Sequence, residues 1–128
     1  MKKYLLAGLF TLLGSAGAYA QSNATDQFCN GAVGGGNAIT AATVSSPGFV
    51  VTAFTPKCSS NVVLNGQDNS TYYSVASASL KGKTIFIGSS AGGGVRAQAA
   101  ACTGTAGACV AGDVTGANGI AAATAISS

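Results

Sequence analysis

Apolar and polar positions are distributed unevenly along the chain. Within residues 21–128, most of the large apolar side chains lie between residues 44 and 88, whereas the flanks on either side consist mainly of alanine, glycine, serine and threonine. Burial of apolar surface is the main driving force of folding. The pattern therefore predicts a single β-rich domain over residues 21–128, with its densest core at about 44–88.

Two short runs of β-branched and aromatic residues in this segment predict strands. They are F-V-V-T-A-F at Phe49–Phe54, which has a proline near each end, and N-V-V-L at Asn61–Leu64, which is followed by Asn65-Gly66. Strands are commonly bounded by such residues. An Asn-Gly dipeptide favours a tight turn because both residues tolerate a positive φ, so we expect a turn there.

The next segment predicts a β-hairpin. The run T-Y-Y-S-V-A-S-A-S-L at Thr71–Leu80 is joined by Lys81-Gly82 to K-T-I-F-I-G at Lys83–Gly88. Two β-rich runs around a glycine are typical of a hairpin. Its lysines would point outward and discourage edge-to-edge pairing.

The flanks have a different composition. N-G-A-V-G-G-G-N at residues 30–37 and G-S-S-A-G-G-G-V at residues 88–95 predict loops, and neither has the spacing of a phosphate-binding motif. The tail, residues 119–128, is assigned as a strand because Ile120 and Ile126 would share one face. We therefore expect an all-β fold, a small antiparallel sandwich or sheet with Gly/Ala-rich flanks.

Residues 1–20 have the pattern of a signal peptide. Lys2 and Lys3 precede an apolar run over Tyr4–Leu13, and Ala18-Tyr19-Ala20 provides small residues for cleavage. This run is shorter than the about 20 residues that span a bilayer. We expect cleavage after Ala20 and a periplasmic, cell-surface or extracellular location without an integral membrane segment.

The charge of residues 21–128 is nearly balanced. The formal net charge of the whole chain is +3, but two of its lysines lie in the predicted signal peptide. A nearly neutral surface gains little from counterion release, which argues against nucleic acid as a partner. The chain also lacks a basic amphipathic helix that would bind an anionic membrane.

The four cysteines, Cys29, Cys58, Cys102 and Cys109, predict two disulfides. No pair has C-x-x-C spacing and the chain contains no histidine, which argues against a zinc or redox site. An even cysteine count in an exported chain indicates disulfides, with three connectivities open. Pairing of sequence neighbours would close loops of about 8 and 30 residues and add about 2.5 and 3.6 kcal/mol. Such staples would compensate for a core that is rich in alanine and glycine.

A different pairing follows from a resemblance. The stretch F-V-V-T-A-F-T-P-K-C-S-S-N-V-V-L, Phe49–Leu64, resembles the early strand of chaperone-usher pilins and spore-coat-U-like proteins. The resemblance implies an immunoglobulin-like sandwich completed by a strand of a neighbouring subunit. It also implies bonds from Cys58 to Cys102 and from Cys29 to Cys109. The chain differs from these families in lacking F-G after Leu64 and a penultimate aromatic residue.

The inventory of chemically active side chains is sparse. Asp26, Asp68 and Asp113 are the only acidic residues, and we interpret Asp68 and Asp113 as turn residues. No serine has a motif that supplies a base. We therefore predict no enzyme activity, no catalytic residues, no cofactor and no metal.

A candidate contact surface lies in the predicted hairpin. Tyr72 and Tyr73 are adjacent, so on a strand they point to opposite faces and at most one can lie in the core. Lys81 and Lys83 would be exposed near the turn. This position fits a contact surface, and it also fits ordinary solvated charges of a hairpin.

These observations predict a small exported structural protein, a self-associating subunit of an extracellular or cell-surface filament, coat or matrix. The alternative is a monomeric periplasmic or secreted binding or inhibitor module that uses the hairpin as its contact surface, with a protein or a glycan as the partner.

Overall fold

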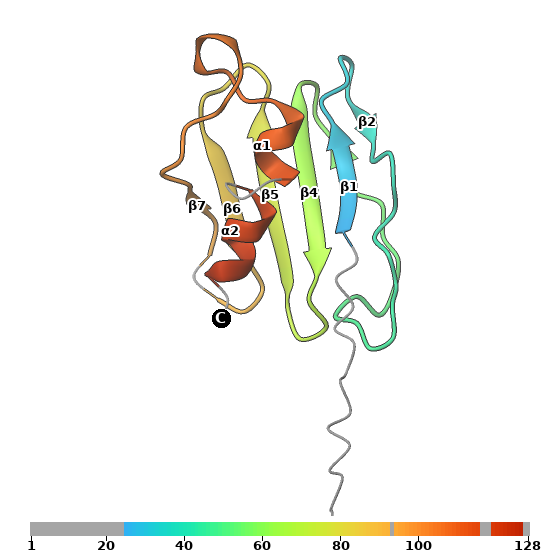
Figure 1. Cartoon of the computed structure of the whole chain (residues 1–128). Helices are drawn as coiled ribbons and strands as arrows, with labels where there is room; N and C mark the ends of the chain where they lie inside the picture. The colour runs from blue at the N-terminus through green and yellow to red at the C-terminus, as the bar shows by residue number, and fades with distance from the viewer. Residues whose placement is uncertain (1–24, 93, 116–118, 127–128) are drawn as a thin grey trace, which may run out of the picture.

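A computed structural model describes residues 25–92, 94–115 and 119–126 of the chain. A five-stranded antiparallel sheet carries two short helices on one face, and a two-stranded sheet lies beyond its first strand (Figure 1). The predicted signal peptide, residues 1–20, is outside the described residues. The prediction of a mostly β, disulfide-stapled antiparallel fold is confirmed.

The large sheet has the strand order β1-β4-β5-β6-β7. Its strands are β1 (Thr25–Asn30), β4 (Val62–Asp68), β5 (Tyr73–Ser79), β6 (Ile85–Ser89) and β7 (Arg96–Ala97). Strands β4 to β7 follow one another as antiparallel neighbours, so the predicted hairpin is confirmed as β5 and β6. The chain passes between β1 and β4 through the small sheet of β2 (Gly36–Asn37) and β3 (Lys57–Cys58).

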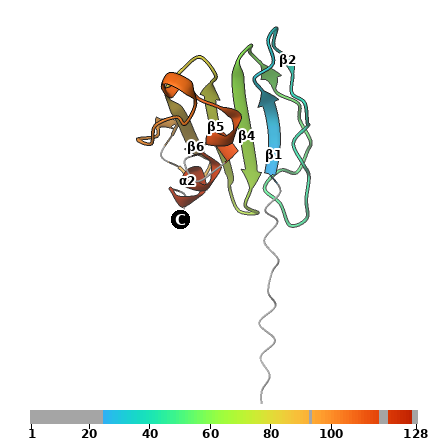
Figure 2. The same ribbon diagram turned by 45° about the horizontal axis from the view of Figure 1, so that its top comes forward.

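The C-terminal part of the chain covers one face of the large sheet. It contains the 3-10 turn η1 (Thr105–Gly107) and the helices α1 (Ala111–Thr115) and α2 (Ile120–Ala125). Figure 2 shows both helices on the same side of the sheet, with the segment that follows β1 at the other edge. Alternate strand residues point to this side, and the buried set is Val63, Ala76, Ala78, Ile85 and Ile87 from strands with Val114, Ile120 and Ala123 from helices.

Residues Ile120–Ala125 of the tail form a helix, and the strand predicted there is wrong. Ile120 and Ala123 are both buried and lie three residues apart, which places them on one helical face. The alanine-rich sequence favours this conformation. The core also extends beyond the predicted 44–88 segment, because Cys102, Cys109 and Val114 belong to it.

The run Phe49–Phe54 is irregular backbone, so the strand predicted there is also wrong. Only Val50 of this run is buried, and it joins a second cluster with Phe28, Ala42 and Tyr73 on the helix-free side of the sheet. Apolar β-branched residues form a strand only where a neighbouring strand offers backbone partners. Here the backbone N–H groups of Phe49 and Val50 bind a carboxylate instead.

Asn65-Gly66 lies inside β4, so the turn predicted at this dipeptide is wrong as well. The ring of Tyr73 crosses over Gly66 on its way to β1, and a Cβ at Gly66 would overlap the Tyr73 ring and approach a Phe28 ring carbon to 2.7 Å. The glycine therefore serves side-chain packing across three strands.

The disulfides join sequence neighbours. Cys29 is bonded to Cys58, with a Cα–Cα distance of 5.7 Å, and Cys102 to Cys109, with a Cα–Cα distance of 4.6 Å. The pairing implied by the resemblance, Cys58 to Cys102 and Cys29 to Cys109, is wrong. In the described part of the chain, neither helix has the length and apolar composition needed to cross a membrane.

Replacement of Gly66 by alanine should destabilise the fold. The new methyl group would displace the Tyr73 ring, and overpacking of this kind costs about 1–3 kcal/mol. Gly112→Ala is the matched control, because a Cβ at Gly112 in α1 has open space around it and alanine favours the helix by up to about 1 kcal/mol. Urea unfolding midpoints would check this, and equal midpoints for the two variants would contradict it.

Candidate interaction surface

All three aspartates of the chain are buried. Asp26, Asp68 and Asp113 are between 0 and 4% exposed. Burial of an ionised carboxylate is costly unless hydrogen bonds replace its water. Each carboxylate receives such bonds from an irregular segment, which is a larger role than the turn positions predicted for Asp68 and Asp113.

Asp26 joins β1 to the segment 38–56. Its carboxylate accepts hydrogen bonds from the backbone N–H of Thr43 at 2.9 Å, from the Thr43 hydroxyl, and from the Tyr73 hydroxyl at 3.1 Å. Burial, together with the negative charge of Asp26, raises the pKa of Tyr73 above its ordinary value. Tyr73 is therefore a neutral hydrogen-bond donor at physiological pH.

Asp68, two residues along β4 from the partner of Asp26 in the sheet, holds the same segment at a second point. Its carboxylate accepts backbone N–H bonds from Phe49 and Val50 at 2.9 Å and from Ser70 at 2.8 Å. Burial acts to raise the pKa of Asp68, but these three bonds outweigh it and hold the pKa below its ordinary value. The side chain is thus ionised in the native protein at neutral pH.

Asp113 closes the loop that Cys102 and Cys109 staple. It accepts hydrogen bonds from the Thr103 hydroxyl at 2.7 Å and from the backbone N–H of Val110 at 2.8 Å. Burial acts to raise the pKa of Asp113, whereas these bonds and the one from the Thr103 backbone lower it, and the net change is a decrease. The two sulfurs and an Asp113 oxygen lie within 4.8 Å of one another. Because both sulfurs are in a disulfide, neither is a thiolate that could ligate a metal.

Burial of the carboxylates leaves a surface with charges of one sign. Among the residues that the structure describes, the exposed charged side chains are Lys57, Lys81, Lys83 and Arg96. A partner can thus form ion pairs with this surface only by contributing anions.

The predicted contact residues are placed in different environments. Tyr73 is buried in the second cluster and Tyr72 is half-buried, in agreement with the expectation that at most one tyrosine lies in the core. Lys81 and Lys83 are exposed at the β5–β6 turn. Gly82 of this turn accepts a hydrogen bond from the backbone N–H of Cys109 at 2.9 Å, so the turn adjoins the stapled loop. These four residues therefore do not form one surface.

A small cleft lies at the end of β1. It has a volume of about 240 Å³ and is lined by residues 28–32, 35, 37, 39, 58, 59 and 62. Apolar Phe28, Ile39 and Val62 and the Cys29–Cys58 disulfide contribute, with Asn30 and Asn37 as the amide side chains. The cleft is smaller than the about 300–1,000 Å³ of typical ligand pockets.

The helix-free side of β5, β6 and β7 carries three apolar side chains, which we call the apolar face: half-buried Val75 and exposed Phe86 and Val95. Phe86 is 45% and Val95 74% exposed. Val75 and Val95 approach each other across Gly88, where a Cβ would lie 3.2 Å from Val95 and 3.6 Å from Val75. The missing side chain at Gly88 lets the two valines form a continuous patch next to Phe86.

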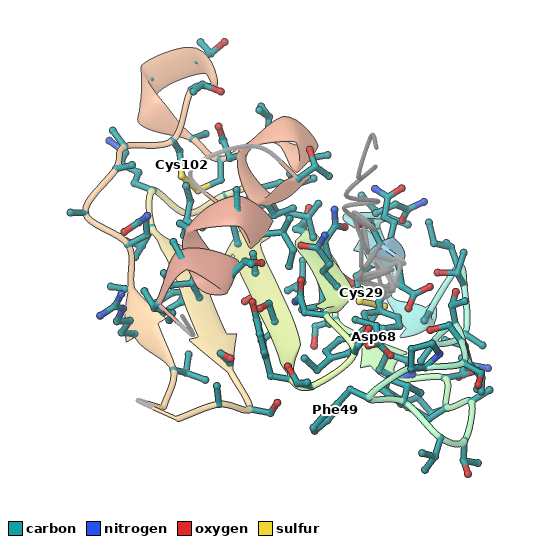
Figure 3. The ribbon with its side chains drawn as sticks, turned by 60° about the horizontal axis from the view of Figure 1, so that its bottom comes forward. Cys29, Phe49, Asp68 and Cys102 are labelled. Atoms are coloured by element: carbon teal, nitrogen blue, oxygen red, sulfur yellow. A yellow bond between two sulfur atoms is a disulfide. The ribbon has the colours of Figure 1, made fainter. Side chains whose placement is uncertain are left out.

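The segment 38–56 adds further apolar surface. Val51 is 84% exposed, and Phe54 is half-exposed with its ring 5.8 Å from that of Phe28. Figure 3 shows the Phe49 side chain projecting outward from this segment, away from the helices, close to Asp68. Exposed apolar residues that gather in this way mark surfaces for association.

The prediction from sequence did not include the apolar face, although a signal was present. In K-T-I-F-I-G the period of two places Phe86 on the face opposite to Ile85 and Ile87. Because both isoleucines are buried under the helices, Phe86 must point to the other side.

Comparisons of the chain with family models, with curated proteins and with solved structures give no match.

Removal of the disulfides should destabilise the protein unequally. The Cys29–Cys58 bond spans 29 positions and the Cys102–Cys109 bond 7, and chain entropy assigns them about 3.6 and 2.5 kcal/mol. We expect the Cys29→Ser/Cys58→Ser variant to unfold at a lower urea concentration than the Cys102→Ser/Cys109→Ser variant, and both at a lower one than the parent. Equal melting temperatures of the oxidised and the reduced parent protein would contradict stabilisation by the disulfides.

Acidification should weaken the fold through Asp68. The pKa of Asp68 is lowered in the native state. Its contribution to the free energy of unfolding is therefore complete above the ordinary pKa of 3.8 and is lost as the pH falls through the native pKa. Asp68→Asn should lower the free energy of unfolding by about 1.5–3 kcal/mol at pH 7. It should also make the free energy of unfolding fall less steeply between about pH 5 and 2. Lys81→Gln, which removes an exposed charge, should keep the parental dependence of unfolding free energy on pH, as measured by urea unfolding at each pH. An unchanged slope in Asp68→Asn would show that Asp68 does not carry this dependence.

Proposed function

We propose that the chain is a small exported structural protein, a subunit that associates with copies of itself in an extracellular or cell-surface assembly. The apolar face carries this proposal. A domain with an alanine-rich core exposes Phe86 and Val95 to solvent, and association with neighbours would bury this area.

The cysteines support the exported location. All four are paired, and disulfides persist mainly in oxidising compartments outside the cytosol. The two bonds are compatible with export, as is the finding that the described helices are too short to cross a membrane.

One observation favours the alternative, a monomeric binding or inhibitor module. Phe86 lies on the β5–β6 hairpin, whose turn also exposes Lys81 and Lys83. The hairpin thus presents an aromatic residue on one strand and two cations at its turn, which suits a partner with apolar and anionic groups.

The oligomeric state of the oxidised protein without its predicted signal peptide distinguishes the two proposed functions. We expect species larger than the monomer in sedimentation velocity between about 10 µM and 1 mM, a range that covers associations of weak to moderate affinity, and ordered assemblies in negative-stain micrographs. A single monomeric species over the whole range would contradict the structural role and favour the binding module.

A further inference from the structure

The structure places two Asn-Gly dipeptides of the chain in opposite environments. The chain contains Asn30-Gly31, Asn65-Gly66 and Asn118-Gly119, and Asn118 lies outside the described residues. Asparagine is chemically labile, because the backbone nitrogen of the next residue can attack its side-chain carbonyl carbon and release ammonia. A following glycine has no Cβ to obstruct this attack. The local structure then decides whether the reaction occurs in the folded protein.

Asn30 is in an open position at the end of β1. Its side chain is exposed, and residues 32–37, which follow Gly31, are all exposed. Residues 30–32 also line the cleft at the end of β1. Within the part of the chain that the structure describes, the backbone N–H of Gly31 donates no hydrogen bond. The Gly31 nitrogen is therefore not held by the sheet, and solvent reaches the Asn30 amide.

A local hydrogen bond brings the reacting groups of Asn30 together. The backbone N–H of Ala32 donates to the Asn30 Oδ1 at 3.0 Å, which closes an Asx turn. The ring of this turn contains Cγ, Cβ, Cα and the carbonyl carbon of Asn30 with the Gly31 nitrogen, and the same atoms form a succinimide ring. The hydrogen bond also withdraws electron density from the side-chain carbonyl, so its carbon becomes a better electrophile.

Asn65 differs from Asn30 in each of these respects. It is 1% exposed and lies in the middle of β4. Gly66 is paired with Asp26 of β1 on one side and with Val75 of β5 on the other. Attack by the Gly66 nitrogen would require β4 to separate from its neighbours. A carboxylate formed at position 65 would also be buried, which is costly, whereas one formed at position 30 would be in water.

From this contrast we propose that Asn30 is a site of spontaneous deamidation in the folded protein and that Asn65 is protected. The Gly31 nitrogen loses its proton to hydroxide and forms a bond to the Asn30 Cγ. The bond from Cγ to the amide nitrogen breaks, and this nitrogen takes a proton from water and leaves as ammonia. Water then opens the succinimide at one of its two carbonyls, which gives aspartate or isoaspartate. No step is an oxidation or a reduction.

Deamidation changes the charge of the exterior. The exposed charged side chains of the described residues are all cations in the unmodified chain. The product adds a carboxylate at position 30, beside the cleft. A more acidic form of the protein therefore accumulates with age, and its new carboxylate can form an ion pair with a cationic partner.

Peptide mapping of the oxidised protein after incubation in mildly alkaline buffer tests the proposal. Deamidation replaces an NH₂ group by OH, and tandem mass spectra assign this mass change to Asn30 or to Asn65. We expect Asn30 to convert about tenfold faster than Asn65 or more, since Asn65 reacts only when β4 opens. In reduced protein unfolded by urea, the two asparagines should convert at similar rates.

Two results of this mapping would overturn the proposal. One is an intact Asn30 in the folded protein after the unfolded chain has converted. The other is equal conversion of Asn30 and Asn65 in the folded protein, which would show that the structure does not select the site.

Asn30→Gln provides the matched variant, because glutamine keeps the amide but must close a larger ring, which forms more slowly. Parent and variant both carry Asn118→Gln, which removes the third dipeptide from the measurement. In isoelectric focusing, we expect the parent to accumulate an acidic form that migrates with Asn30→Asp, and Asn30→Gln to lose it. Accumulation at the parental rate in Asn30→Gln would place the reaction elsewhere. Gly31 is unsuitable for substitution, since a Cβ there would overlap Leu80.

Discussion

The fold depends on buried carboxylates that bind the backbone of segments without regular structure. Asp26 and Asp68 hold the segment 38–56 against the sheet at two separate points, and Asp113 closes the stapled loop. Segment 38–56 contains several large apolar residues, but only Val50 among them is buried, so hydrophobic contact alone contributes little to holding it in place. A charge-assisted hydrogen bond is about twice as strong as a neutral one, so a few carboxylates can order backbone that a small core cannot.

The two disulfides act on the same segments as the carboxylates. The Cys29–Cys58 bond joins β1 to β3 and so fixes the end of the segment 38–56, while Asp26 and Asp68 fix its middle. Cys102–Cys109 and Asp113 fix the loop that leads into α1. Covalent and electrostatic restraints together thus replace bulky side chains in a chain that has 19 glycines.

Elements with local signals could be predicted from the sequence, and those that depend on distant partners could not. The β5–β6 hairpin and the start of β4 follow from alternation and turn residues close by. By contrast, Gly66 lies in a strand because β1 and β5 pair with β4 on both sides, and Phe49–Phe54 is irregular because Asp68, about 19 residues away, binds the N–H groups of Phe49 and Val50. The bond from Tyr73 to Asp26 spans 47 positions. The alanine-rich tail fits a strand or a helix by local pattern, and only its packing on β5 and β6 decides for the helix.

Of the candidate surface, Lys81 and Lys83 could be placed from the turn, whereas the exposure of Phe86 becomes evident once the helices cover one side of the sheet.

The enclosure of every side-chain carboxylate also governs how the molecule responds to its surroundings. The chain has no histidine, the side chain whose charge ordinarily changes between pH 5 and 8, and its aspartates are shielded by their backbone partners. The described exterior therefore lacks the side chain that ordinarily acts as a switch in this interval, and contacts made through that exterior have no histidine-based acid trigger.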